Sequence, residues 1–196
     1  EKISTVSVHT LCAAEVIDAE NWWAEDFNSL TQQYTIPDCW SNEEGTTTSS
    51  SYKWGAVGTG AVGSAYLRFN SYNNADGTTN VLATPMLTLP ETPAQLVFLC
   101  KNPTGGDFNV AIDGEDGVRD TVLSNLTGIA DWQEQKIMLG DYAGQTIRIF
   151  FNATSNCGTS AGNCFIDLDS VVINAAPNCM PVKNIEKFSV SENEVV

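Results

Sequence analysis

Two aspartates lie inside a stretch that otherwise has the composition of a buried strand. The segment NCFIDLDSVVI, residues 163–173, is rich in β-branched and apolar side chains, yet it contains Asp167 and Asp169. Because side chains alternate along a strand, both carboxylates point to one face. A buried carboxylate is costly unless a cation or a hydrogen-bond donor pairs with it. Two interpretations stay open: an exposed edge face, with Ile166 and Leu168 turned to the core, or a site for a hard cation.

A cation would need further ligands, because calcium takes about six to eight oxygens. Glu25 and Asp26 form a second acidic pair just before Phe27. If the first and last strands of the domain pair with each other, these groups can meet the aspartates near residue 168. The four carboxylates are therefore the candidate metal ligands.

Catalytic residue types are scarce, which predicts a protein that is not an enzyme. His9 is the single histidine, so a Ser-His-Asp or Cys-His site would have to be built around it. The acidic cluster Asp113, Glu115, Asp116 and Asp120 is the nearest candidate for glycosidase carboxylates. The sequence DGEDG at 113–117, however, indicates a hairpin turn first.

Aromatic side chains offer a binding chemistry instead, because exposed Trp and Tyr rings stack on sugars. Trp22 and Trp23 are adjacent and cannot both point inward from a strand, so one of them is the candidate exposed ligand-binding residue. Trp40, Trp54 and Trp132 are expected in the core.

The net charge excludes some partners. Nine Lys and Arg stand against 24 Asp and Glu, a net charge of −15. Nucleic acid and anionic membrane surfaces both need a basic protein surface, so neither is expected to bind. No apolar run reaches the roughly 20 residues of a membrane helix, and no membrane insertion is expected.

Six cysteines without a CxxC pair favour disulfides in an oxidising compartment over a zinc site. Cys157 and Cys164 flank a short Gly/Ser/Thr loop, which predicts a local bridge. Cys100, in the apolar run LVFLC, is either a buried free thiol or a bridge partner. The pairing of Cys12, Cys39, Cys100 and Cys179 stays open at this point.

Strand patterns separated by turn residues dominate the middle of the chain and predict an all-β, two-sheet antiparallel β-sandwich with jelly-roll topology. A short helical pattern at 13–30 is ambiguous. The expected strands are Ala65–Asn70, Val81–Leu89, Gln95–Cys100, Asn109–Asp113, Thr121–Leu126, Glu134–Leu139, Thr146–Asn152 and Phe165–Asn174.

The two ends differ from the middle. Residues 1–14 are expected to be a linker or the last strand of a preceding module, and residues 15–176 the main domain. Residues 177–196 contain a proline-bearing linker and then an alternating pattern, as expected of a first strand. The sequence has the features of a mature or excised fragment.

Six motifs follow one another in a fixed order along the chain. They are FNSLTQQYTIPDCW (27–40), KWG (53–55), SAYLRF (64–69), LATPMLTL (82–89), DWQEQKIMLGDYAGQTIRIFF (131–151) and IDLDSVVI (166–173). This order resembles the MAM-like jelly rolls of bacterial surface proteins, which include the cleaved-adhesin domains of gingipains and the choice-of-anchor domains. The resemblance covers roughly residues 25–174 and implies a jelly roll that often carries structural calcium. Both ends look like strands of fibronectin-type-III modules.

The resemblance also implies which carboxylates hold calcium. Asp169 matches the first aspartate of the family's last-strand pair, whereas Ser170 replaces the second. Glu25 or Asp26 matches the first-strand ligand, and Asp167 has no counterpart. We therefore expect a structural calcium ion shared between Asp169 and the first strand.

The expected function is a non-catalytic adhesion or binding module of a secreted or cell-surface bacterial protein. Its partner would be a host or bacterial surface protein or glycan, and its neighbours would be fibronectin-type-III-like modules. A carbohydrate-binding module attached to a glycan-degrading enzyme is the alternative, and a structural spacer is another. The ligand and the oligomeric state do not follow from the sequence.

Overall fold

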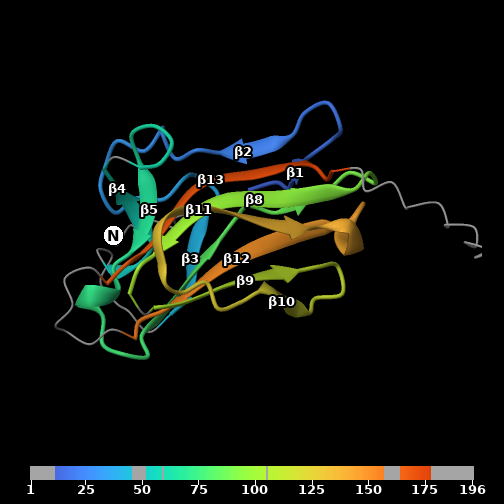
Figure 1. Ribbon diagram of the computed structural model, residues 1–196. Coiled ribbons are helices and arrows are strands. Elements are labelled where there is room, and N and C mark those ends of the chain that lie inside the picture. The colour runs from blue at the N-terminus through green and yellow to red at the C-terminus, as the bar shows by residue number, and fades with distance from the viewer. Residues whose placement is uncertain (1–11, 46–51, 59, 105, 157–163, 178–196) are drawn as a thin grey trace, which may run out of the picture.

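A computed structural model describes residues 12–45, 52–58, 60–104, 106–156 and 164–177, and these residues form two facing β-sheets (Figure 1). The predicted all-β sandwich is confirmed. One sheet contains, in the described residues, β1 (Glu15–Val16), β3 (Ser41–Gly45), β6 (Thr79–Ala83), β7 (Leu87–Thr88), β9 (Asp107–Asp113), β10 (Arg119–Leu123) and β12 (Thr146–Thr154). The other contains β2 (Trp23–Glu25), β4 (Gly55–Val57), β5 (Tyr66–Phe69), β8 (Ala94–Asn102), β11 (Ile129–Met138) and β13 (Ile166–Ala175).

The chain passes back and forth between the sheets, as a jelly roll requires. From β11 onward each strand lies in the opposite sheet to the one before it, and strands distant in sequence become neighbours. β13 lies between β8 and β5, and β12 lies between β9 and β6. Of the pairs in the described residues, only β1 with β7 is parallel. Two short 3-10 turns, η2 (Ser71–Asn73) and η3 (Gly140–Tyr142), complete the elements.

The strand expected at Glu134–Leu139 is the longer β11, which begins at Ile129. Two other expected strands divide or end early for local reasons. The predicted strand at 81–89 is two strands, β6 and β7, separated at Pro85, which has no N–H for a sheet ladder. The predicted strand at 121–126 is β10, which ends at Leu123, and Asn125 has a φ of 62°. A left-handed residue cannot continue a strand.

The helical pattern at 13–30 is not a helix. The segment contains β1 and β2 instead, and both take their partners from distant parts of the chain. β1 pairs with β7, and β2 pairs with β13. Between them Asp18 closes a turn, because its Oδ1 accepts the N–H groups of Glu20 and Asn21. Tertiary pairing therefore outweighs a weak local pattern.

The core lies between the sheets and is built from aromatic rings. Phe151 is in ring contact with Trp40, Phe98 and Phe108, and Phe108 contacts Trp54. Within the described residues no helix is long and apolar enough to cross a membrane. Residues 1–11 and 178–196, where fibronectin-type-III-like strands are expected, lie outside the described residues, so that expectation stays a prediction.

Candidate functional site

Asp167 is paired with Arg68, its cross-strand neighbour on β5. Both carboxylate oxygens accept bonds from the guanidinium, from Nε at 2.6 Å and from Nη2 at 2.8 Å. Asp167 is 1% exposed because β13 is a central strand, so an exposed edge face is wrong, whereas Ile166 and Leu168 do face the core as that interpretation expected. Burial raises the pKa of Asp167 to about 6, and the arginine opposes this rise.

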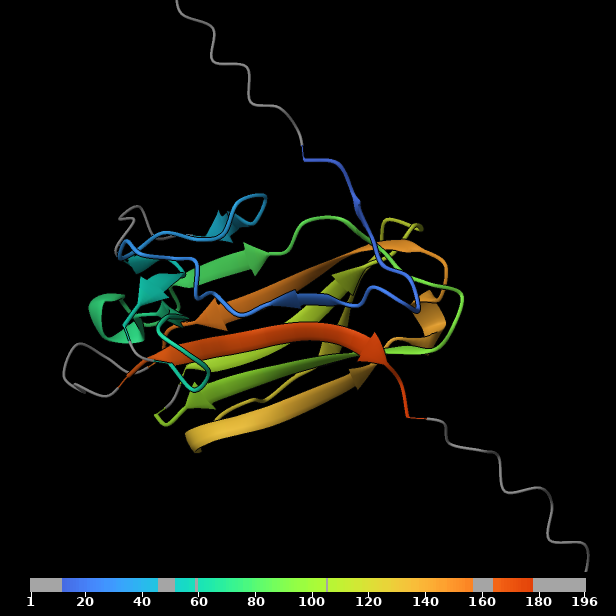
Figure 2. The same cartoon turned by 90° about the horizontal axis from the view of Figure 1, so that it is seen from above.

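Asp169 is paired with backbone amides of the loop between β4 and β5. Its Oδ2 accepts the N–H groups of Ala61 and Val62 at 2.8 and 2.9 Å. Figure 2 shows this loop, in teal, crossing over the N-terminal part of β13, in red. A Cβ at Gly60 would lie 2.6 Å from Oδ2, so the close approach needs glycine there.

The second oxygen of Asp169 has no partner. The residue is fully buried, and Oδ1 makes no hydrogen bond. Desolvation raises the pKa of Asp169, the loop amides lower it, and the charge of Asp26 raises it. A buried oxygen without a donor, close to a second acid, fits a cation.

Glu25, the last residue of β2, and Asp26, which follows it, do come to the last strand, β13. β2 pairs with β13, and Glu25 lies opposite Val171. Glu25 Oε1 accepts the N–H of Phe27 at 2.8 Å, and burial raises the pKa of this carboxyl. Asp26 accepts the N–H of Asn28, and that bond lowers the pKa of Asp26.

The four predicted metal ligands therefore divide into three groups. Asp167 is committed to Arg68, and Glu25 has one oxygen on the backbone. The charge of Asp26 raises the pKa of Asp169, whose buried Oδ1 makes no hydrogen bond. Within the described residues no group of three His, Cys, Asp or Glu side chains converges on one point, so backbone and amide oxygens would have to complete a calcium site.

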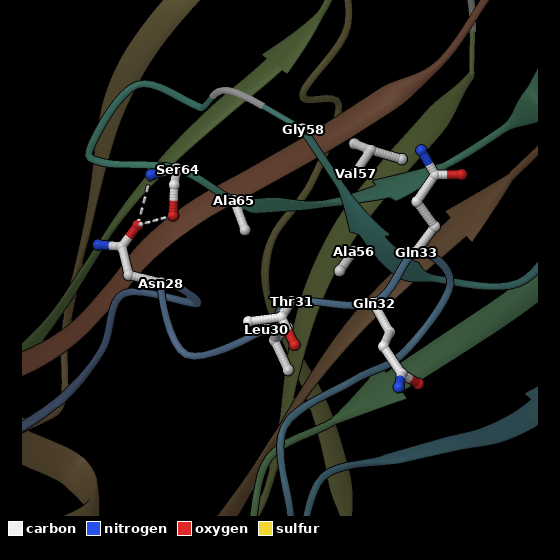
Figure 3. A pocket seen from close by; sticks show the side chains of 10 residues that line it. All are labelled: Asn28, Leu30, Thr31, Gln32, Gln33, Ala56, Val57, Gly58, Ser64 and Ala65. Carbon is white, nitrogen blue, oxygen red and sulfur yellow. Dashed lines mark hydrogen bonds between the residues drawn. The ribbon is translucent and has the colours of Figure 1, made fainter.

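An open pocket of about 400 Å³ lies beside the loop between β4 and β5 (Figure 3). One wall is joined to the Asp26 turn, because Asn28 Oδ1 accepts the backbone N–H of Ser64 at 2.6 Å. All the lining side chains are uncharged, and several are amides or hydroxyls. They are Asn28, Leu30, Thr31, Gln32, Gln33, Ala56, Val57, Gly58, Ser64 and Ala65.

Trp40 and Trp54 are core residues, as expected, whereas the other tryptophans lie differently from the prediction. Trp22 and Trp23 are half-buried and pack against the core. Trp23 also stacks on Trp40, and its Nε1 donates to Glu15. Trp132 is half-buried outside the core cluster, which corrects the expectation that it is a core residue. The alternation of β11 is irregular between Ile129 and Gln133, and this irregularity hides the orientation of Trp132 from a pattern.

Among the described cysteines, two form a disulfide with each other, one is disulfide-bonded and one is a free thiol. Cys12 and Cys39 form a disulfide, which the sequence had left open. Cys164 is disulfide-bonded, but its predicted partner Cys157 lies outside the described residues. Cys100 is a buried free thiol, and burial raises its pKa to about 12.

The acidic cluster at 113–120 belongs to a hairpin, as the turn sequence predicts. β9 and β10 pair antiparallel across it, and Gly117 has a φ of 71°. Asp113 forms an ion pair with Arg119 at 2.9 Å.

Several solved structures share this fold. The K1 cleaved adhesin domain of Lys-gingipain from Porphyromonas gingivalis W83 matches with a TM-score of 0.54 and 18% identity, over 80% of this chain and 99% of that domain. Two further adhesin domains of that protein match similarly. The carbohydrate-binding module TmCBM61, solved with β-1,4-galactotriose, matches at 0.53 and 14% identity, over 71% of this chain and 90% of that one.

The CBM22-1 xylan-binding domain of Paenibacillus barcinonensis Xyn10C matches with a TM-score of 0.52 and 12% identity, over 84% of this chain and all of that one. No protein-family model matches this chain, and no curated protein is significantly similar to it. At these identities the matches establish the fold: this chain has the β-sandwich of cleaved adhesin domains and carbohydrate-binding modules.

Proposed function

We propose that this chain is a non-catalytic extracellular binding module of a larger bacterial surface or secreted protein. The observation that carries the proposal is the fold itself, which spans nearly all of an adhesin domain and of two carbohydrate-binding modules. Fold alone is an associational warrant for function. The proposed partners are surface proteins or glycans, and fibronectin-type-III-like modules are the proposed neighbours in the parent chain.

An extracellular location has independent chemical support. The Cys12–Cys39 bridge and the bonded Cys164 both require an oxidising compartment to persist. The pocket beside Asn28 and Ser64 is one proposed contact region, since its amides and hydroxyls can donate and accept hydrogen bonds.

We also propose that calcium stabilises the end of the sandwich around Asp169. The open buried Oδ1 of Asp169 and the nearby charge of Asp26 are the observations that support it. Asp169 and Asp26 would hold the ion, with Glu25 as a further candidate, and Asp167 is left out because Arg68 occupies both its oxygens. When bound, the ion would neutralise carboxylates that repel each other and clamp the first strand to the last.

A binding panel tests the proposed function. The chain would be applied to a glycan array and to immobilised host and bacterial surface proteins, in calcium and then in chelator. Reproducible saturable binding to any member of either panel supports a binding module. A blank result on both panels would favour the spacer alternative.

A further inference from the structure

We propose that the outer face of the six-stranded sheet, around Trp132, binds a neutral glycan. This inference rests on the proposed binding function and gives that function a ligand class and a surface. The surface, called here the Trp132 face, consists of Tyr66 and Arg68 on β5, Lys101 on β8, Trp132 on β11 and Phe165 just before β13. In Figure 1 these strands lie in the same sheet.

Two aromatic rings meet at the centre of this face. Tyr66 and Trp132 are 5.4 Å apart between ring centroids, at an interplanar angle of 87°. Tyr66 points away from the core, because its neighbour Leu67 is a core residue and side chains alternate along β5. Both rings are half-buried, so part of each stays accessible to a ligand. Aromatic surfaces of this kind stack on the apolar faces of sugar rings.

The polar ends of both rings are open. Among the described residues, neither the Tyr66 hydroxyl nor the Trp132 indole N–H has a hydrogen-bond partner. By contrast, the indole N–H groups of Trp23 and Trp54 both donate to protein oxygens. Half-buried Tyr and Trp tips normally find a partner. Their openness here leaves a directional donor beside each stacking surface, which is the combination that a sugar ring uses.

The remaining side chains add hydrogen-bond donors. Arg68 uses Nε and Nη2 on Asp167 and stacks over the Phe165 ring at 3.8 Å, which holds its guanidinium in place. Lys101 Nζ lies 5.8 Å from the same ring. Sugar hydroxyl and ring oxygens are acceptors that match such donors.

Local charge selects a neutral ligand. The two cations of the face, Arg68 and Lys101, are offset by two carboxylates on the adjacent strand, Asp167 and Asp169. The whole chain carries a net charge of −15. An anionic glycan would therefore meet no net local attraction and a repulsive overall field.

The test uses the intact chain on an array of neutral, uronate-containing and sulfated oligosaccharides, beside a panel of surface proteins. The strongest neutral hit is then titrated against the wild type, Trp132→Ala, Tyr66→Ala and Tyr66→Phe. Tyr72→Ala is the matched control, since Tyr72 is an aromatic residue 40% exposed outside this face. Thermal melts check that each variant folds, and Trp132→Phe replaces Trp132→Ala if the latter does not.

The expected result is binding to neutral glycans that weakens at least tenfold in Trp132→Ala and Tyr66→Ala. Tyr66→Phe keeps the ring but loses the hydroxyl, so its affinity for the glycan should fall several-fold. Tyr72→Ala should bind the glycan as tightly as the wild type does. Trp132→Phe is expected to retain part of the affinity through stacking.

Other results overturn the inference in distinguishable ways. Neutral-glycan binding that ignores Trp132 and Tyr66 would place the site elsewhere and leave the proposed function standing. Binding only to charged glycans, or only to proteins, would refute the ligand class and also leave that function standing. A blank on every panel would refute both.

Discussion

The outer face of the seven-stranded sheet buries an aromatic ring under two arginines, whereas the outer face of the six-stranded sheet leaves two rings half-exposed. Phe150 is 1% exposed and packs in a small cluster with Val81, Ala83 and Ala111. The guanidinium carbons of Arg119 and Arg148 lie 3.6 and 5.8 Å from its ring. On the other sheet, the Arg68 guanidinium carbon lies 5.4 Å from the centre of the Tyr66 ring, yet Tyr66 and Trp132, which contact each other, both stay half-buried.

The difference lies in how the polar groups are paired. Arg119 is bound to Asp113, and Arg148 is bound to Glu43, to the Ser41 hydroxyl and to the Thr84 carbonyl. Both arginines over Phe150 are thus bound to other groups of the protein, and together they cover an apolar ring. The same residue types can form a surface whose polar groups are all paired within the protein or one that leaves them for a ligand. The two cases are distinguished by whether the polar groups already have hydrogen-bond partners.

The largest expected effect separates the two faces by stability. Phe150→Ala should lower the free energy of unfolding by about 3–5 kcal/mol, because it empties a buried site. Trp132→Ala should cost only about 1 kcal/mol, the typical value of an edge-to-face contact. Urea unfolding of both variants measures this, and equal losses would mean that Trp132 is as structural as Phe150.

The next effect compares an ion pair from each face. Asp167→Asn should cost about 1–3 kcal/mol, since it weakens a buried pair that satisfies Arg68. Asp113→Asn, the partner of Arg119, should cost less than about 1 kcal/mol, because both side chains of that pair are 31% exposed. Chemical unfolding of the two variants at one pH gives the comparison. A larger loss for Asp113→Asn would reverse the assignment of the buried pair.

Calcium should act on the six-stranded sheet alone. At about 100 times its Kd, calcium should add roughly 2.7 kcal/mol of stability, which raises Tm by roughly 5–10 °C. Asp169→Asn should abolish this rise, whereas Glu43→Gln on the opposite sheet should keep it. Melting curves in calcium and in chelator measure both variants. A full calcium response in Asp169→Asn would remove this residue from the proposed site.

The smallest effect is on a reaction rate. Cys100 lies on β8 in the six-stranded sheet, and burial raises its pKa to about 12, so almost no thiolate exists at pH 8. DTNB should leave this thiol untouched in the native state and label it after unfolding, when its pKa returns to about 8.5. Peptide mapping identifies the labelled residue. Rapid native labelling of Cys100 would indicate that this sheet opens easily.

The sequence predicted the sandwich well where strands are long and alternate. β8, β9, β12 and β13 all lie close to their expected bounds because each buries an apolar stripe. The prediction failed in the segment at 13–30. Its short strands are defined by partners more than 50 residues away, Leu87 and Val171 among them, and no local pattern contains that information.

The sequence identified the two aspartates of the candidate site but not the residues that surround them. The i, i+2 spacing correctly indicated that Asp167 and Asp169 share a face, but not that β13 is central. Arg68 is the partner that the sequence left unnamed, although it stands in the SAYLRF motif. Trp132 was expected in the core as a large aromatic residue, and the irregular register of β11 next to it leaves no alternation that would show its orientation.

The Cys12–Cys39 bridge has a mechanical consequence. The two cysteines are 27 positions apart, and the enclosed segment contains β1, β2, Asp26 and Asn28. Tension applied to the chain ahead of Cys12 passes through the sulfur atoms to Cys39 and does not load that segment. The contacts of β2 with β13 are thereby shielded from pulling on this side. Under reducing conditions the same tension would run through β1 and β2 first and peel them from their sheets one after the other.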